Sequence, residues 1–140
     1  RDAFSDVFDI LSSKDANNPI ILHSWTGGNK WTKRFVELGV YFSISGIITY
    51  DTAHDLQAAV TKIPRDRLLL ETDVPYLSPQ PFKGKKNNPT YIKYTGAKVA
   101  ELLNLTPNEL SEITISNTNK VMNRDIYEWI FLDRKVKWKT

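Results

Sequence analysis

The stretch from Leu68 to Leu77, LLLETDVPYL, places two acidic residues directly after three leucines. The leucines predict a buried strand, and a strand that runs on through Asp73 would turn Glu71 and Asp73 to the same face. A buried carboxylate is costly unless it is paired with a cation or bound to a metal. His23 follows another short apolar run, IIL. Imidazole and carboxylate together suit a divalent metal such as zinc, manganese or magnesium.

A metal bound by these side chains would activate a water molecule for hydrolysis. His23 and Asp73 are too few ligands, because a catalytic zinc takes at least three from protein, so the residues alone give an incomplete site. Each residue also has a structural interpretation. His23 suits a hydrogen-bonded histidine at a strand end, Asp73 a cap or a lysine partner, and Glu71 a structural ion pair. The residues alone leave both interpretations open.

Two serines and the second histidine are weaker candidates. Ser43 and Ser45 lie two apart in VYFSISG, so they share a strand face, and we expect them to fill the core or form hydrogen bonds. No base lies near them in the sequence, which argues against a serine nucleophile. His54 falls early in a predicted helix, where we expect it to be exposed.

The elements that must position these residues alternate between helices and strands. Apolar spacing and turn residues predict the order α-β-α-β-α-β-α-α, which is typical of parallel β/α units. Ligands of such folds gather at the carboxyl ends of the strands. Because a (β/α)8 barrel needs about 250 residues, the 140 residues suit half of one or a small open sheet. Helices are predicted near 4–11, 31–38, 52–63, 89–103 and from 106 onward, and strands at 20–24, 40–46 and 67–73.

Composition and charge narrow the class of protein. The chain is 41% hydrophobic and 25% charged, as in ordinary globular proteins. It has no apolar run near the length of about 20 residues that a membrane span needs. Because cysteine is absent, disulfides and thiolate metal sites are excluded, and we expect a cytoplasmic location. The net charge is +3, with five lysines and no acid from Lys83 to Lys98. This segment suits a phosphate-bearing partner, or it is a solvated loop.

Four segments carry a resemblance to a known family: HSWTGG, YFSISGIITY, IPRDRLLLETDVPYLSPQPFKGKKNNP and NTNKVM. They resemble the TatD family of metal-dependent deoxyribonucleases, and the block from Glu71 to Pro89 is the most specific part. The resemblance spans residues 1–122 and leaves a basic, aromatic tail at 123–140 outside it. It implies the C-terminal part of a TIM (β/α)8 barrel with about three strands. It also implies hydrolysis of phosphodiester bonds, usually in DNA, with one or two magnesium, manganese or zinc ions.

The resemblance assigns roles to individual residues. His23 stands at a metal-binding histidine, and Asp73 at the final metal-binding aspartate, which also helps to orient the attacking water. Glu71 stands beside them as a supporting acid.

The loop after Asp73 matches the family's basic segment. Lys83, Lys85, Lys86 and Asn87 stand where the resemblance implies contacts to substrate phosphates. The sequence departs from the family pattern at Asn88, where a glutamate is usual.

The family's H-x-H motif, its metal-bridging glutamate and one further histidine have no match in this sequence. We therefore expect the rest of the barrel to come from another chain or a homo-oligomer, and the isolated chain to lack activity. The alternative is a non-catalytic fragment or pseudo-enzyme that self-associates or binds nucleic acid through its lysines. An unrelated α/β binding module would leave LLLETD unexplained.

Overall fold

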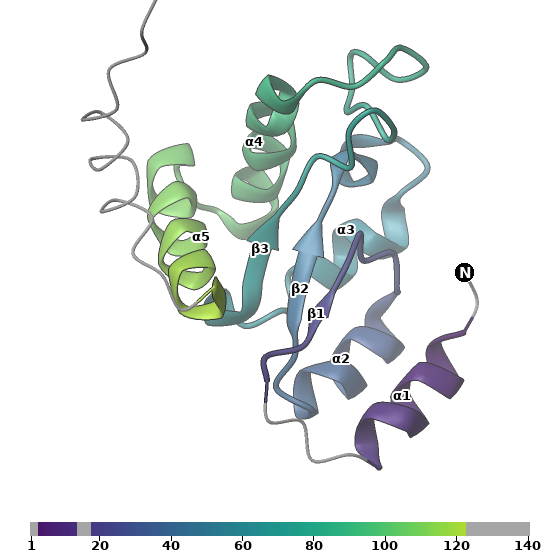
Figure 1. The fold of residues 1–140 in the computed structure, drawn as a ribbon. Coiled ribbons are helices and arrows are strands. Elements are labelled where there is room, and N and C mark those ends of the chain that lie inside the picture. The colour runs from purple at the N-terminus through teal and green to yellow at the C-terminus, as the bar shows by residue number, and fades with distance from the viewer. Residues whose placement is uncertain (1–2, 14–17, 123–140) are drawn as a thin grey trace, which may run out of the picture.

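The computed structural model describes residues 3–13 and 18–122, and the predicted tail at 123–140 lies outside them (Figure 1). Helices and strands follow one another in the predicted order. The strands are β1 (Ile21–Leu22), β2 (Tyr41–Ile44) and β3 (Leu68–Leu70). The α-helices are α1 (Phe4–Ser12), α2 (Asn29–Glu37), α3 (His54–Val60), α4 (Ile92–Leu103) and α5 (Pro107–Met122). Short 3₁₀ helices are η1 (Gly46–Thr49), η2 (Arg65–Arg67) and η3 (Pro89–Tyr91).

The strands form one parallel sheet in the order β1-β2-β3, which confirms the predicted three-stranded α/β architecture. Ile21 pairs with Tyr41, and Phe42 pairs with Leu68. Helix α2 connects β1 to β2, and α3 connects β2 to β3, so each connection is a β/α unit. All three strands therefore end at the same edge of the sheet, from which the long loop after β3 rises (Figure 1).

The core lies around β2. Phe42 and Ile44 of this strand are fully buried, as is Phe35 of α2. Trp25, just after β1, packs edge-on against Phe35 and Phe42 with ring centroids 5.3 Å away in both cases. Its indole N–H donates to the Thr32 hydroxyl at 2.9 Å. The backbone next to His23 is thus anchored by a buried aromatic side chain.

The strands are shorter than predicted. The prediction that β3 extends through Asp73 was wrong, because the strand ends at Leu70 and Asp73 has a φ of +55°. Ser24 also leaves the extended region, with a φ of +45°, and Ser45 directly precedes η1. The alternation argument for Glu71 and Asp73 therefore fails, although both acids still reach the same place, as described below. The third helix begins at His54 rather than near residue 52, because η1 and a turn come first.

Side-chain caps mark the starts of η3 and α5. The Asn88 side chain accepts from the N–H of Thr90 at the start of η3, which leads into α4. Thr106 and Glu109 form a capping box before α5, with the Thr106 N–H donating to Glu109 at 2.8 Å. In the described part of the chain, no helix combines the length and apolar character that crossing a bilayer requires.

Candidate metal centre

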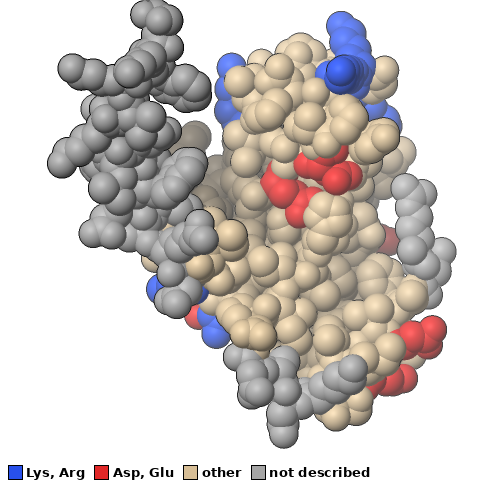
Figure 2. All heavy atoms as spheres, viewed as in Figure 1, with Lys and Arg blue, Asp and Glu red and all other residues tan. Residues whose placement is uncertain are grey.

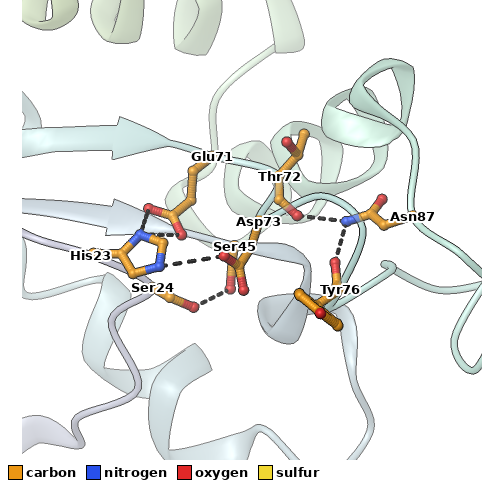
Figure 3. Close-up of polar contacts among 8 residues, drawn as sticks. All are labelled: His23, Ser24, Ser45, Glu71, Thr72, Asp73, Tyr76 and Asn87. Atoms are coloured by element: carbon orange, nitrogen blue, oxygen red, sulfur yellow. Dashed lines mark hydrogen bonds and ion pairs between the residues drawn. The ribbon is translucent and has the colours of Figure 1, made fainter.

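His23, Glu71 and Asp73 meet at the carboxyl edge of the sheet (Figure 3). The imidazole Nδ1 lies 3.0 Å from a Glu71 oxygen, and Nε2 lies 3.4 Å from Oδ1 of Asp73. One ligand atom from each residue falls within 4.8 Å of the other two. Across residues 3–13 and 18–122, no other three histidine, cysteine or acidic side chains gather in this way. The structure thus brings together the three residues that the sequence singled out.

The backbone around the cluster stays tied to β2 after the neighbouring strands have ended. The N–H of Glu71 donates to the carbonyl of Ile44 at 3.0 Å, and the N–H of Trp25 donates to that of Ser43 at 2.9 Å. The left-handed residue Asp73 then turns the chain out of the sheet direction. These contacts hold the ends of β1 and β3 on either side of β2, so their side chains converge over its end.

The contacts of His23 define the useful tautomer. In the tautomer with its proton on Nδ1, that proton points to Glu71 and the Nε2 lone pair faces Asp73. Metal-binding histidines commonly donate their second ring N–H to a carboxylate in this way. Two ligands of a tetrahedral zinc lie roughly 3.3 to 3.4 Å apart, given bonds of about 2.0 to 2.1 Å. The separation of Nε2 and Oδ1 fits that value.

Glu71 carries an unsatisfied oxygen. Nδ1 of His23 is 3.0 Å from both of its oxygens, but only Oε2 is aligned to accept the hydrogen. Oε1 is buried and has no hydrogen-bond partner in the described part of the chain. A buried carboxylate oxygen without a donor is costly, and a nearby cation offsets that cost. The donor set therefore fits a divalent ion, with His23 (68% exposed) open to solvent above the two more buried acids.

Two serines lie beside the cluster. The hydroxyls of Ser24 and Ser45 are 2.9 Å apart, and Ser45 is fully buried (Figure 3). Ser43 is buried in β2. These positions agree with hydrogen-bonding and core roles rather than with a nucleophile. His54 is exposed at the start of α3, as expected.

The lysine loop lies on the surface. Lys83, Lys85 and Lys86 are exposed, and the ammonium of Lys83 lies 4.4 Å from the ring centroid of Tyr50. None of the ion pairs found in the described residues joins these lysines to the cluster. Figure 2 shows basic side chains at the upper end of a face whose middle carries acidic side chains. The phosphate-binding role of the lysines remains a prediction.

Asn87 is placed differently from the lysines. It is only 5% exposed, and its amide nitrogen donates to the carbonyls of Thr72 and Tyr76 (Figure 3). Tyr76 itself was not singled out in the sequence, yet it is 70% exposed and only three positions after Asp73. The sequence did contain a signal for Tyr76: it is a tyrosine that directly follows a proline, close to Glu71 and Asp73.

A hollow of about 670 Å³ opens beside His23 and Ser24. Apolar side chains line much of it, among them Phe4, Val7 and Leu77. An organic group would fit next to the imidazole.

Known proteins resemble the chain over most of its length. Residues 1–123 match the family described as TatD related DNase. The chain is 38% identical over 122 residues to the uncharacterized metal-dependent hydrolase YabD of Bacillus subtilis, covering 86% of the chain and 48% of YabD. It is 35% identical over 126 residues to the uncharacterized metal-dependent hydrolase YcfH of Escherichia coli, covering 89% of the chain and 48% of YcfH.

The fold is similar to that of a solved structure. The TatD homologue YJJV of Escherichia coli superposes with a TM-score of 0.81 at 28% identity, over 86% of this chain and 47% of YJJV. The predicted partial TIM barrel is thereby confirmed. The chain spans about half the length of the relatives it matches.

Proposed function

This chain belongs to the TatD-related DNase family, and from that premise we propose that the protein hydrolyses phosphodiester bonds, most readily those of DNA, with a divalent metal. Its relatives are named metal-dependent hydrolases. The observation that carries the proposal is the meeting of His23, Glu71 and Asp73 with a ligand separation that suits a metal.

In this proposal His23 would hold the ion through Nε2, and Asp73 would hold it through Oδ1. The bound ion would polarise the phosphodiester and lower the pKa of a water molecule. Glu71 keeps the proton on Nδ1 of His23, which fixes the ring plane and the free lone pair. The second oxygen of Asp73 would accept a hydrogen from the attacking water and so orient it. Lys83, Lys85 and Lys86 attract the phosphate backbone toward the site.

The remaining ligands belong to the proposal as well. Because the chain spans about half the length of its relatives, we place them on another segment, a second chain or a second copy. A cytoplasmic location, expected from the cysteine-free sequence, is also part of the proposal.

The test uses the full-length protein with manganese or magnesium and two substrates. One is a DNA oligonucleotide, and the other is a carboxylic ester. We expect metal-dependent cleavage of DNA, loss of cleavage in Asp73→Asn, and normal cleavage in His54→Ala. If the protein hydrolyses the ester but does not cleave DNA, it is a hydrolase, and the proposal that its substrate is a phosphodiester is wrong.

A second candidate is a non-catalytic nucleic-acid-binding protein. The exposed lysines favour it, since they need no metal to bind phosphates. It predicts DNA binding that weakens with salt in the presence of EDTA, with no cleavage in any metal. Cleavage that Asp73→Asn abolishes excludes it.

A further inference from the structure

We propose that Asn87 is a positioning residue, which holds the turn at residues 72–76 so that Asp73 faces His23. The inference rests on the proposed role of Asp73 as a metal ligand. It gives Asn87 a function that needs no contact with the substrate.

The side-chain amide of Asn87 and its backbone N–H all bond within the protein. Its Nδ2 donates to the carbonyls of Thr72 at 2.5 Å and Tyr76 at 2.6 Å. Its backbone N–H donates to the carbonyl of Pro75 at 3.0 Å, and its Oδ1 accepts from the N–H of Asn88 at 2.8 Å. Because the amide is buried and both of its hydrogens are bonded, no donor is left for a phosphate. The burial favours positioning over direct substrate contact.

The two hydrogen bonds from the Asn87 side chain hold the backbone on either side of Asp73. Thr72 precedes it and Tyr76 follows it, while the N–H of Tyr76 donates to the Asp73 carbonyl at 2.8 Å. Asp73 has a φ of +55°, a left-handed conformation that is unfavourable for a non-glycine residue. Such a conformation persists only where the surroundings enforce it. The Asn87 amide supplies that constraint at both ends of the turn.

The chain offers a matched control at the opposite end of β3. Asn117 of α5 is 2% exposed, and its Nδ2 also donates to two backbone carbonyls, those of Arg65 at 2.7 Å and Leu68 at 2.9 Å. Changing either asparagine to aspartate keeps the shape but sets a carboxylate oxygen against two carbonyls. Both changes therefore disturb folding, and only the one at position 87 touches the turn that carries Asp73.

The experiment measures manganese binding to the full-length protein by calorimetry, at a temperature where circular dichroism shows each variant folded. We expect Asn87→Asp to weaken manganese binding about 10- to 100-fold, the range found for outer groups that orient metal ligands. Asn117→Asp should stay within twofold of wild type. If Asn87→Asp does not fold, Asn87→Ser, which keeps one donor, replaces it. Equal effects of the two asparagine variants, or none from either, would overturn the proposal.

Amide hydrogen exchange separates this inference from the proposed function. In metal-free protein, Asn87→Asp should accelerate exchange at the Tyr76 N–H about tenfold, whereas Asn117→Asp should not change it. If the wild-type protein binds no manganese, the proposed metal site is wrong. The exchange rate of the Tyr76 N–H would still test whether Asn87 holds the turn at residues 72–76. Unchanged exchange in Asn87→Asp would overturn the positioning role itself.

Discussion

The Nδ1 atom of His23 lies 3.0 Å from both carboxylate oxygens of Glu71, a residue 48 positions later in the chain. The contact spans the sheet from the end of β1 to the end of β3, across β2. The other ring nitrogen, Nε2, lies 3.4 Å from Oδ1 of Asp73. We therefore expect Glu71 to act on a bound ion through the histidine, by holding a proton on Nδ1.

Replacing Glu71 tests that indirect action. Glu71→Gln keeps the volume but removes the charge that holds the Nδ1 proton, so we expect manganese affinity to fall about 10- to 100-fold by calorimetry. Glu112→Gln, on the exposed side of α5, is the control and should have no effect. If Glu71→Gln abolishes binding as completely as Asp73→Asn does, Glu71 is itself a ligand.

The two histidines of the chain give a second prediction. His23→Ala removes the imidazole from the cluster, and we expect manganese affinity to fall more than about 100-fold, beyond the loss from an outer group. His54→Ala changes an exposed residue at the start of α3 and should leave affinity unchanged. Equal affinities in the two variants would mean that the ion, if bound, does not use His23.

The element order and the cluster were predictable because both rest on local signals. Three leucines before Glu71 predict a strand, and parallel strands bring their ends to one edge. The place where each strand stops was not predictable. Ser24 and Asp73 adopt left-handed backbone conformations that neither residue type requires. Those conformations depend on contacts far away in the sequence, such as that between Asn87 and the turn at residues 72–76.

The position of Asn87 in the site was also not predictable from the sequence. The resemblance implied that Asn87 contacts substrate phosphates together with Lys83, Lys85 and Lys86. Asn87 is buried because the loop returns to Tyr76, whose carbonyl accepts a hydrogen from the Asn87 amide. The sequence around Asn87 does not predict that path of the loop. The exposure of Tyr76 has the same origin.

The close packing around Gly46 predicts that a larger residue there destabilises the fold near the site. A Cβ at this position would overlap the Leu77 carbonyl oxygen and come within 2.9 Å of the Pro79 nitrogen. Gly46→Ala should therefore lower the free energy of unfolding by roughly 1 to 3 kcal/mol, as overpacking does. Gly96→Ala is the control, since its Cβ would meet only Leu70 at 3.5 Å and helix propensity favours alanine by up to about 1 kcal/mol. Chemical denaturation that ranks Gly46→Ala as the more stable variant would contradict the close approach.

The capping box before α5 predicts a pH dependence. The backbone N–H of Thr106, and then its hydroxyl, lower the pKa of Glu109 below the usual 4.5. A lowered pKa in the folded state means that the contribution is present above the unfolded value and is lost as the pH falls through the folded one. At pH 7 the melting temperature of the wild type should thus be higher than that of Glu109→Ala, and the difference between the two melting temperatures should shrink below about pH 4.5. A difference that stays constant down to pH 3 would exclude the charged cap.

The lysine loop gives the last prediction, which concerns DNA binding under the proposed function. Lys85 and Lys86 are exposed neighbours, and neither forms one of the ion pairs found in residues 3–13 and 18–122. If each neutralises one phosphate, the double change to alanine should reduce the slope of log affinity against log salt by about 2. Lys33 of α2 and Lys62, just after α3, are exposed controls whose replacement should leave the slope unchanged. Fluorescence anisotropy with a labelled duplex in EDTA measures binding without cleavage. Equal slopes for the two double variants would show that the positive charge acts only through the net charge of the protein, and not through contacts made by this loop.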